Sequence, residues 1–176
     1  MPGIHTTAYL LLQLLNPSLV RQSSIHVMPF NEIINSVSNG TVDAGLIIHE
    51  SRFTYASHGL SKIVDLGEWW EGETGLPIPL GGIIARRSLG DVITRKINAI
   101  IRSSIEYASS NRSEPIKYIQ KYSQELSPDI INQHINLYVN EYSLDIGNDG
   151  EKAAIELLMR AADAGIIQKV EGSIFI

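Results

Sequence analysis

The sequence predicts an α/β fold, because segments with helical periodicity alternate with short apolar runs that are typical of buried strands. The first helix is expected in "HTTAYLLLQLLNP", where Thr6 or His5 can cap the N-terminus and Pro17 stops the repeat. A short strand is expected in "IHVMPF", and a second helix in "NEIINSVSNG", which ends at Gly40. The run "DAGLIIH" then has the nearly continuous apolar character of a strand in a parallel sheet.

The second half of the chain predicts mostly helix. Further strands are expected in "KIVDL" and "IIARR", on either side of a Gly- and Pro-rich surface segment with a helical turn around Trp69 and Trp70. Amphipathic helices are then expected in "GDVITRKINAIIRSSIEYASSN", "SEPIKYIQKYSQ", "SPDIINQHINLYVNEYS" and "NDGEKAAIELLMRAADAG". We therefore expect an α/β lobe in residues 1–82, and in residues 83–176 a returning strand with helices that have no sheet of their own to cover.

The composition excludes several classes of protein. The 176 residues are 44% hydrophobic and 19% charged, which is enough apolar material for a core and too little charge for disorder. The net charge of −5 argues against a nucleic-acid partner, which would need a basic face. The lack of cysteine excludes disulfides and thiolate chemistry and fits a cytoplasmic location. No apolar run approaches the about 20 residues of a membrane span.

The helix start "PGIHTTAY" is one candidate ligand site. His5, Thr6 and Thr7 crowd its first turn, where free backbone N–H groups and the helix dipole favour an anion. A carboxylate or a phosphate could bind there, with the threonine hydroxyls as further donors. The simpler interpretation is that Thr6 only caps the helix, which is the more common role of a threonine at this position.

His49 is the candidate catalytic residue. It ends the apolar run "GLIIHESRFTY", and ligands of open α/β sheets bind beyond the carboxyl ends of the strands. Imidazole is also the side chain best suited to proton transfer near neutral pH. A structural histidine bonded to a backbone carbonyl fits the pattern equally well. No HExxH or EF-hand spacing is present, so the sequence supports no metal site.

Four segments together resemble the 1,4-dihydroxy-6-naphthoate synthases of the futalosine route to menaquinone. They are "PGIHTTAYLLLQL", "VDAGLIIHESRFTY", "VDLGEWWEGETGLPIPLGGIIARR" and "YVNEYSLDIGNDGEKAAIELL", and they occur in the family's order over nearly all of the chain. The resemblance implies the fold of type II periplasmic binding proteins, with two α/β lobes around a cleft. It also implies a lyase that needs no cofactor and no metal. The family's substrate, cyclic dehypoxanthine futalosine, carries a carboxylate. The resemblance assigns the general base to His49 and substrate contacts to Thr6 and Thr7.

The sequence departs from this family at its N-terminus. Family members have a long segment before "PGxHTTAY", which supplies most of the first lobe's sheet and one wall of the cleft. We therefore expect a C-terminal fragment, a mis-assigned start codon or half of a split gene, so that the partner of this chain is a missing N-terminal half or a second copy. Two alternatives to the enzyme are a solute-binding module with the same fold and an interaction remnant whose exposed helices dimerise.

Overall fold

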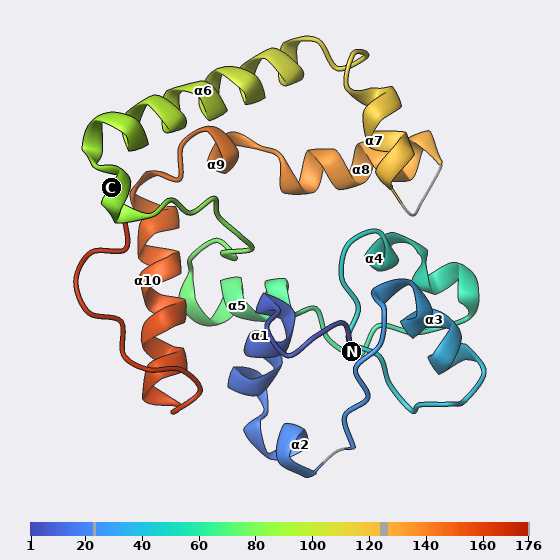
Figure 1. The fold of residues 1–176 in the computed structure, drawn as a ribbon. Coiled ribbons are helices and arrows are strands. Elements are labelled where there is room, and N and C mark those ends of the chain that lie inside the picture. Colours follow the sequence, from blue (N-terminus) through green and yellow to red (C-terminus); the bar gives the residue numbers. More distant parts are fainter. Residues whose placement is uncertain (23, 124–126, 176) are drawn as a thin grey trace. The chain divides into compact units, whose positions relative to one another are not determined.

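The computed structural model describes residues 1–22, 24–123 and 127–175 (Figure 1). The chain forms two compact units. The first contains Met1–Leu80 and Asn148–Glu171, and the second contains Gly81–Gly147 and Gly172–Ile176. Each unit is described by itself below.

The first unit is built from short helices. They are α1 (Thr7–Leu15), α2 (Pro17–Gln22), α3 (Phe30–Ser38), α4 (Ser51–Thr54), a 3₁₀ turn at Tyr55–His58, α5 (Leu66–Thr74) and all but the first residue of α10 (Gly147–Asp163). The helices predicted from the sequence are confirmed at α1, α3 and α10. Pro17 does more than stop α1, since it is also the first residue of α2, a position where its missing N–H costs nothing.

The core of the first unit joins three helices that are far apart in the sequence. Leu11 of α1, Trp70 of α5 and Leu157 of α10 are buried against one another. The indole N–H of Trp70 donates to the carbonyl of Pro77 at 3.0 Å, and the guanidinium of Arg160 lies 5.6 Å from the ring centroid. Trp70 is 0% exposed, so it is a packing residue within a segment that the sequence otherwise predicts to lie at the surface. It packs because α5 is a full helix with an apolar side.

The second unit is mostly helical. It contains a 3₁₀ turn at Arg87–Leu89, α6 (Asp91–Ser110), α7 (Ile116–Tyr122), α8 (Pro128–Tyr138) and α9 (Glu141–Leu144). Within it, Arg102 of α6 donates to the carbonyl of Leu144 at 3.3 Å, and Arg112 donates to Asn136 of α8 at 2.7 Å. These positions confirm the predicted helices, including the proline at the first turn of α8.

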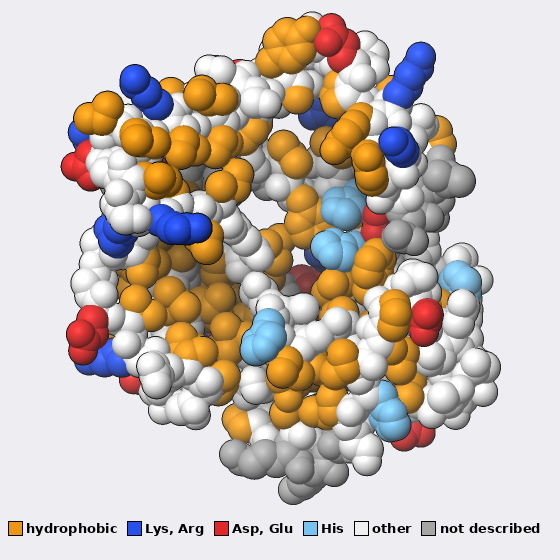
Figure 2. Space-filling model, in the orientation of Figure 1, with side chains coloured by type: hydrophobic (Ala, Val, Ile, Leu, Met, Phe, Trp, Pro, Cys, Tyr) orange, Lys and Arg blue, Asp and Glu red, His pale blue; other side chains and the backbone are white. Residues whose placement is uncertain are grey.

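Large apolar side chains of the second unit remain exposed. Ile84 is 95% exposed and Ile83 is 77% exposed, and α6 presents exposed Ile93, Ile100 and Tyr107 at heptad spacing along one side. Figure 2 shows hydrophobic side chains gathered over this helix. We call the three exposed residues of α6, Ile93, Ile100 and Tyr107, the open apolar face. Within the described ranges, no helix is long and apolar enough to cross a membrane.

The predicted strands are not found. In the described parts of the chain, residues 25–30, 43–49, 62–66 and 83–87 contain no strand, and Phe30 and Leu66 instead begin helices. An apolar run indicates burial, but a strand also needs a neighbour that completes its hydrogen-bond ladder. A short piece of such a ladder joins the N-terminus to residues 26–28. The amino group of Met1 donates to the carbonyl of His26 at 2.6 Å, and the carbonyl of Met1 accepts from the N–H of Met28 at 3.1 Å, which is the pattern of a parallel pair. In the described residues, the helices of the predicted α/β fold are therefore present and its strands are not.

Candidate functional site

The two candidate threonines lie at the start of α1, and both hydroxyl groups have backbone partners. Thr6 has extended backbone angles and is the N-cap, as predicted, because its Oγ1 accepts from the N–H of Tyr9 at 3.2 Å. The same hydroxyl donates to the carbonyl of Gly3 at 2.9 Å, and the Thr7 hydroxyl donates to the carbonyl of Leu80 at 3.2 Å. The hydroxyls therefore fix the backbone around the helix start. The contact of Thr6 and Thr7 with a substrate stays a prediction.

His49 lies at a backbone turn directly before α4. Its φ is +56°, and among the residues that the structure describes it is the one non-glycine with positive φ. This left-handed conformation costs about 1–2 kcal/mol for most side chains, although histidine is among those that adopt it more often. The carbonyl of His49 accepts from the N–H of Arg52 at 3.4 Å, which begins the helical turn. Conformational strain of this kind is concentrated at functional sites, which fits a functional role for His49. The role of general base stays a prediction.

The imidazole of His49 packs on the first residue of α3. Its ring centroid lies 5.1 Å from that of Phe30, with the two planes at 69°. This is the edge-to-face geometry that aromatic rings prefer. His49 itself is exposed and Phe30 is partly buried. Thr6, Thr7 and His49 all belong to the first unit. The threonines contact the backbone around the start of α1, whereas His49 contacts Phe30.

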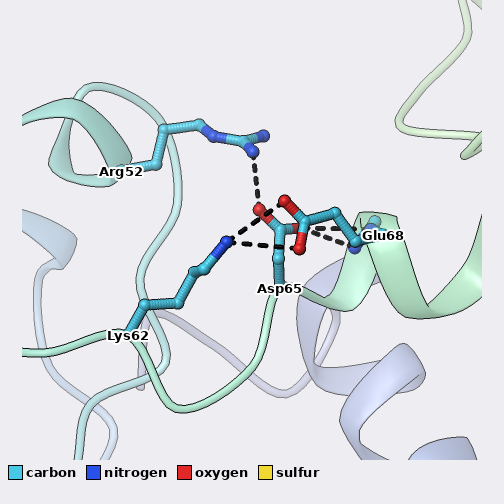
Figure 3. A network of polar contacts seen from close by, with 5 residues as sticks. Arg52, Lys62, Asp65 and Glu68 are labelled. Atoms are coloured by element: carbon cyan, nitrogen blue, oxygen red, sulfur yellow. Dashed lines mark hydrogen bonds and ion pairs between the residues drawn. The ribbon is translucent and has the colours of Figure 1, made fainter.

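A polar network connects the turn after His49 to α5 (Figure 3). Arg52 of α4 pairs with Asp65 at 2.8 Å, and Asp65 also caps α5 by accepting from the N–H groups of Gly67 and Glu68 at 2.9 and 3.3 Å. Lys62 bonds both carboxylate oxygens of Glu68 at 3.1 and 3.2 Å, and this carboxylate raises the pKa of the Lys62 ammonium. Because Arg52 lies three residues after His49, its ion pair anchors the catalytic candidate to a helix of the core.

Gly45 sets the distance between α3 and the segment that leads to His49. A β-carbon at Gly45 would lie 2.5 Å from Cγ2 of Ile33 and 3.0 Å from Cγ2 of Val37. Ile33 is 1% exposed, and its branched methyl group is held rigidly, so the added carbon could not be accommodated by a simple side-chain rotation. The segment can therefore approach α3 this closely only with glycine at position 45.

Replacing Gly45 with alanine is expected to lower the free energy of unfolding by about 1–3 kcal/mol, the usual cost of overpacking. Urea unfolding followed by circular dichroism measures this change. The matched control is Gly72→Ala in α5, where an added β-carbon has nothing within 4 Å. That control should be neutral or stabilising by up to about 1 kcal/mol, as for glycine in an open helical position. Equal effects of the two substitutions would contradict the tight contact at Gly45.

Metal ligands do not gather at this site. In the described ranges, no group of three His, Asp or Glu side chains is arranged to hold a metal ion. Three acidic residues of α5, Glu68, Glu71 and Glu73, are exposed. Glu73 pairs with Arg160 of α10 at 3.8 Å and Glu68 with Lys62, so two of these carboxylates take part in surface ion pairs.

Comparison with known proteins identifies close relatives. Residues 1–163 match the model of a family described as "Menaquinone biosynthesis". A 1,4-dihydroxy-6-naphthoate synthase of Thermus thermophilus is 44% identical over 100% of this chain and 63% of its own length. An enzyme of the same name from Streptomyces coelicolor is 47% identical over 95% of this chain and 60% of its own length.

A solved structure extends the comparison to the fold. The crystal structure of a protein from Archaeoglobus fulgidus superposes with a TM-score of 0.86 at 37% sequence identity, covering 94% of this chain and 61% of the archaeal one. The chain therefore spans about three fifths of the length of the relatives it matches. The fold of this chain is therefore similar to that of a solved protein whose sequence is clearly related.

Proposed function

The chain belongs to the menaquinone biosynthesis family, and from this premise we propose that it is the larger part of an enzyme that converts cyclic dehypoxanthine futalosine into 1,4-dihydroxy-6-naphthoate. The observation that carries the proposal is the 44–47% identity to two relatives named as this synthase, which extends over nearly the whole chain. We propose a cytoplasmic location, which fits a biosynthetic enzyme without cysteine. The substrate is a small carboxylate, and the proposed reaction involves no nucleic acid, membrane or cofactor.

In the proposed mechanism, His49 is the general base. It takes up the proton that must leave the substrate for elimination, and the sugar-derived part departs with the electron pair of the bond that breaks. The exposure of the imidazole supports this role, since a base must be reachable by the substrate. The bend at His49 and the Arg52–Asp65 pair would hold the backbone of this turn in one place. Preorganised geometry of this kind is a large part of catalytic power.

The substrate carboxylate is proposed to bind at the start of α1. Thr6 and Thr7 already fix the backbone there through their bonds to Gly3 and Leu80, so the first N–H groups of the helix have a rigid frame. Helix N-termini favour anions through these groups and the helix dipole. Each threonine oxygen also has lone pairs that could bond a bridging water. In this proposal α1 anchors the substrate and His49 removes its proton.

The remaining wall of the cleft is proposed to come from sequence outside these 176 residues. We expect the two-lobed fold of type II periplasmic binding proteins, with residues 1–82 in one lobe and the helices of residues 83–176 covering a sheet of the other. The open apolar face supports this, because apolar surface gains about 25 cal/mol per Å² when buried. α10 is an exception to this division. It lies within residues 83–176, but its Leu157 packs in the core of the first unit.

The test compares the 176-residue chain with an extended protein, in which the N-terminal segment of the Thermus thermophilus relative is fused before Met1. The extended protein is expected to release 1,4-dihydroxy-6-naphthoate from the futalosine substrate, detected by liquid chromatography, whereas the chain alone should release none. A folded extended protein that binds a small carboxylate but never converts the substrate would overturn the enzyme proposal. Turnover by the chain alone would overturn the need for the missing wall. Sedimentation of the chain alone tests the homodimer.

A further inference from the structure

We infer that Phe30 is a positioning residue for the imidazole of His49, which deepens the proposed function because it assumes that His49 is the base. The two rings are in edge-to-face contact, with centroids 5.1 Å apart and planes at 69°. Such a pair contributes about 0.5–1.5 kcal/mol beyond the area it buries. That energy is enough to favour one orientation of a side chain over its alternatives by several-fold.

The surroundings of His49 make an orienting contact necessary. The side chain is exposed, so packing in the core does not by itself fix its rotamer. Its backbone has φ +56°, which directs the Cα–Cβ bond differently from that of a residue in a strand. A base must lie within hydrogen-bond reach of the proton it removes, and a displacement of about 1 Å can cost about 100-fold in rate. The contact with Phe30 limits that displacement.

Phe30 is itself held on a rigid frame. It is the first residue of α3, and Pro29 before it accepts the first hydrogen bond of the helix from Glu32 at 3.0 Å. Further along α3, Ile33 and Ile34 are buried. The helix therefore presents the ring from a fixed position.

The same helix contacts the His49 segment at a second point. Gly45 approaches Ile33 and Val37 so closely that no β-carbon fits, and four residues later the imidazole meets Phe30. Two contacts between the same pair of segments fix both their separation and their relative direction. The geometry explains why an aromatic residue at the start of α3 would matter to chemistry on a different segment.

The first experiment observes the ring contact directly. In the extended protein, two-dimensional NMR of the imidazole C–H groups resolves the histidines, five of which lie in these 176 residues, and the His49→Asn spectrum identifies His49. Phe30→Leu should shift the His49 resonance by removing the ring current, while Phe30→Tyr should leave it nearly unchanged. An unchanged His49 resonance in Phe30→Leu would overturn the inference, whether or not the protein converts the futalosine substrate.

The second experiment measures the consequence for turnover. Phe30→Leu is expected to lower kcat about tenfold with KM within about twofold, and Phe30→Tyr should restore kcat. The matched control is Ile33→Val, which loosens the packing of the same helix by about 0.5–1.5 kcal/mol but keeps the ring. A loss of kcat in Ile33→Val equal to that in Phe30→Leu would show a merely structural role and overturn the inference. If the wild-type extended protein has no turnover, the proposed function fails and the NMR result still decides the contact.

Discussion

Replacing His49 with asparagine in the extended protein is expected to lower kcat by about 10²–10⁴-fold, the usual contribution of a general base. Asparagine is the sharpest replacement because it tolerates a positive φ better than most residues, so it preserves the bend at position 49. It cannot take up a proton, however. The loss should therefore appear in kcat, with little change in KM or in the midpoint of thermal unfolding. Chromatographic assay of naphthoate release and circular dichroism measure these quantities.

His58 provides the control for this prediction. It is an exposed histidine in the 3₁₀ turn Tyr55–His58, close in sequence to His49 but with an ordinary backbone conformation. His58→Asn should leave kcat within about twofold of the wild type. An extended protein that makes naphthoate at the normal rate with His49→Asn would remove His49 from the role of base. A loss of folding in the same variant would instead be seen by circular dichroism before any assay.

The helices could be predicted because their signals are local. Thr6 caps α1, Gly40 follows α3 with φ +75°, and Pro128 begins α8, so each boundary depends on residues within one turn of it. The length of α6 followed from its apolar periodicity in the same way. α5 was underestimated although its signal is present, since Asp65 and Glu68 have the spacing of a capping box. That spacing favours a full helix around Trp70.

The strands could not be settled from the sequence, because a ladder depends on a second segment that local sequence does not identify. The run that ends at His49 is apolar, which predicts a buried strand, but its residues 43–49 are exposed or only partly buried. The site was predictable only in part for the same reason. His49 and Thr6 are recognisable from their positions at element ends, but the contact between Phe30 and His49 and the pair between Arg52 and Asp65 join segments with no fixed spacing.

Replacing Trp70 with alanine is expected to lower the free energy of unfolding by about 3–5 kcal/mol, a large part of the about 5–15 kcal/mol of a typical domain. Trp70 is fully buried between Leu11 and Leu157, so its loss leaves a cavity between α1, α5 and α10. The substitution also leaves the carbonyl of Pro77 without its indole donor and removes the ring under Arg160. Urea unfolding of the extended protein followed by circular dichroism measures the change.

Two further variants separate the contributions of Trp70. Trp70→Phe keeps most of the buried ring but cannot donate to Pro77, so it should cost about 1–3 kcal/mol, the penalty of an unsatisfied, partly buried acceptor together with the smaller ring. Trp69→Ala is the matched control, because Trp69 is the adjacent residue of α5 and is only partly buried. It should cost clearly less than Trp70→Ala. If the two alanine variants unfold at the same urea concentration, Trp70 does not centre the core, and the packing that unites α1, α5 and α10 must lie elsewhere.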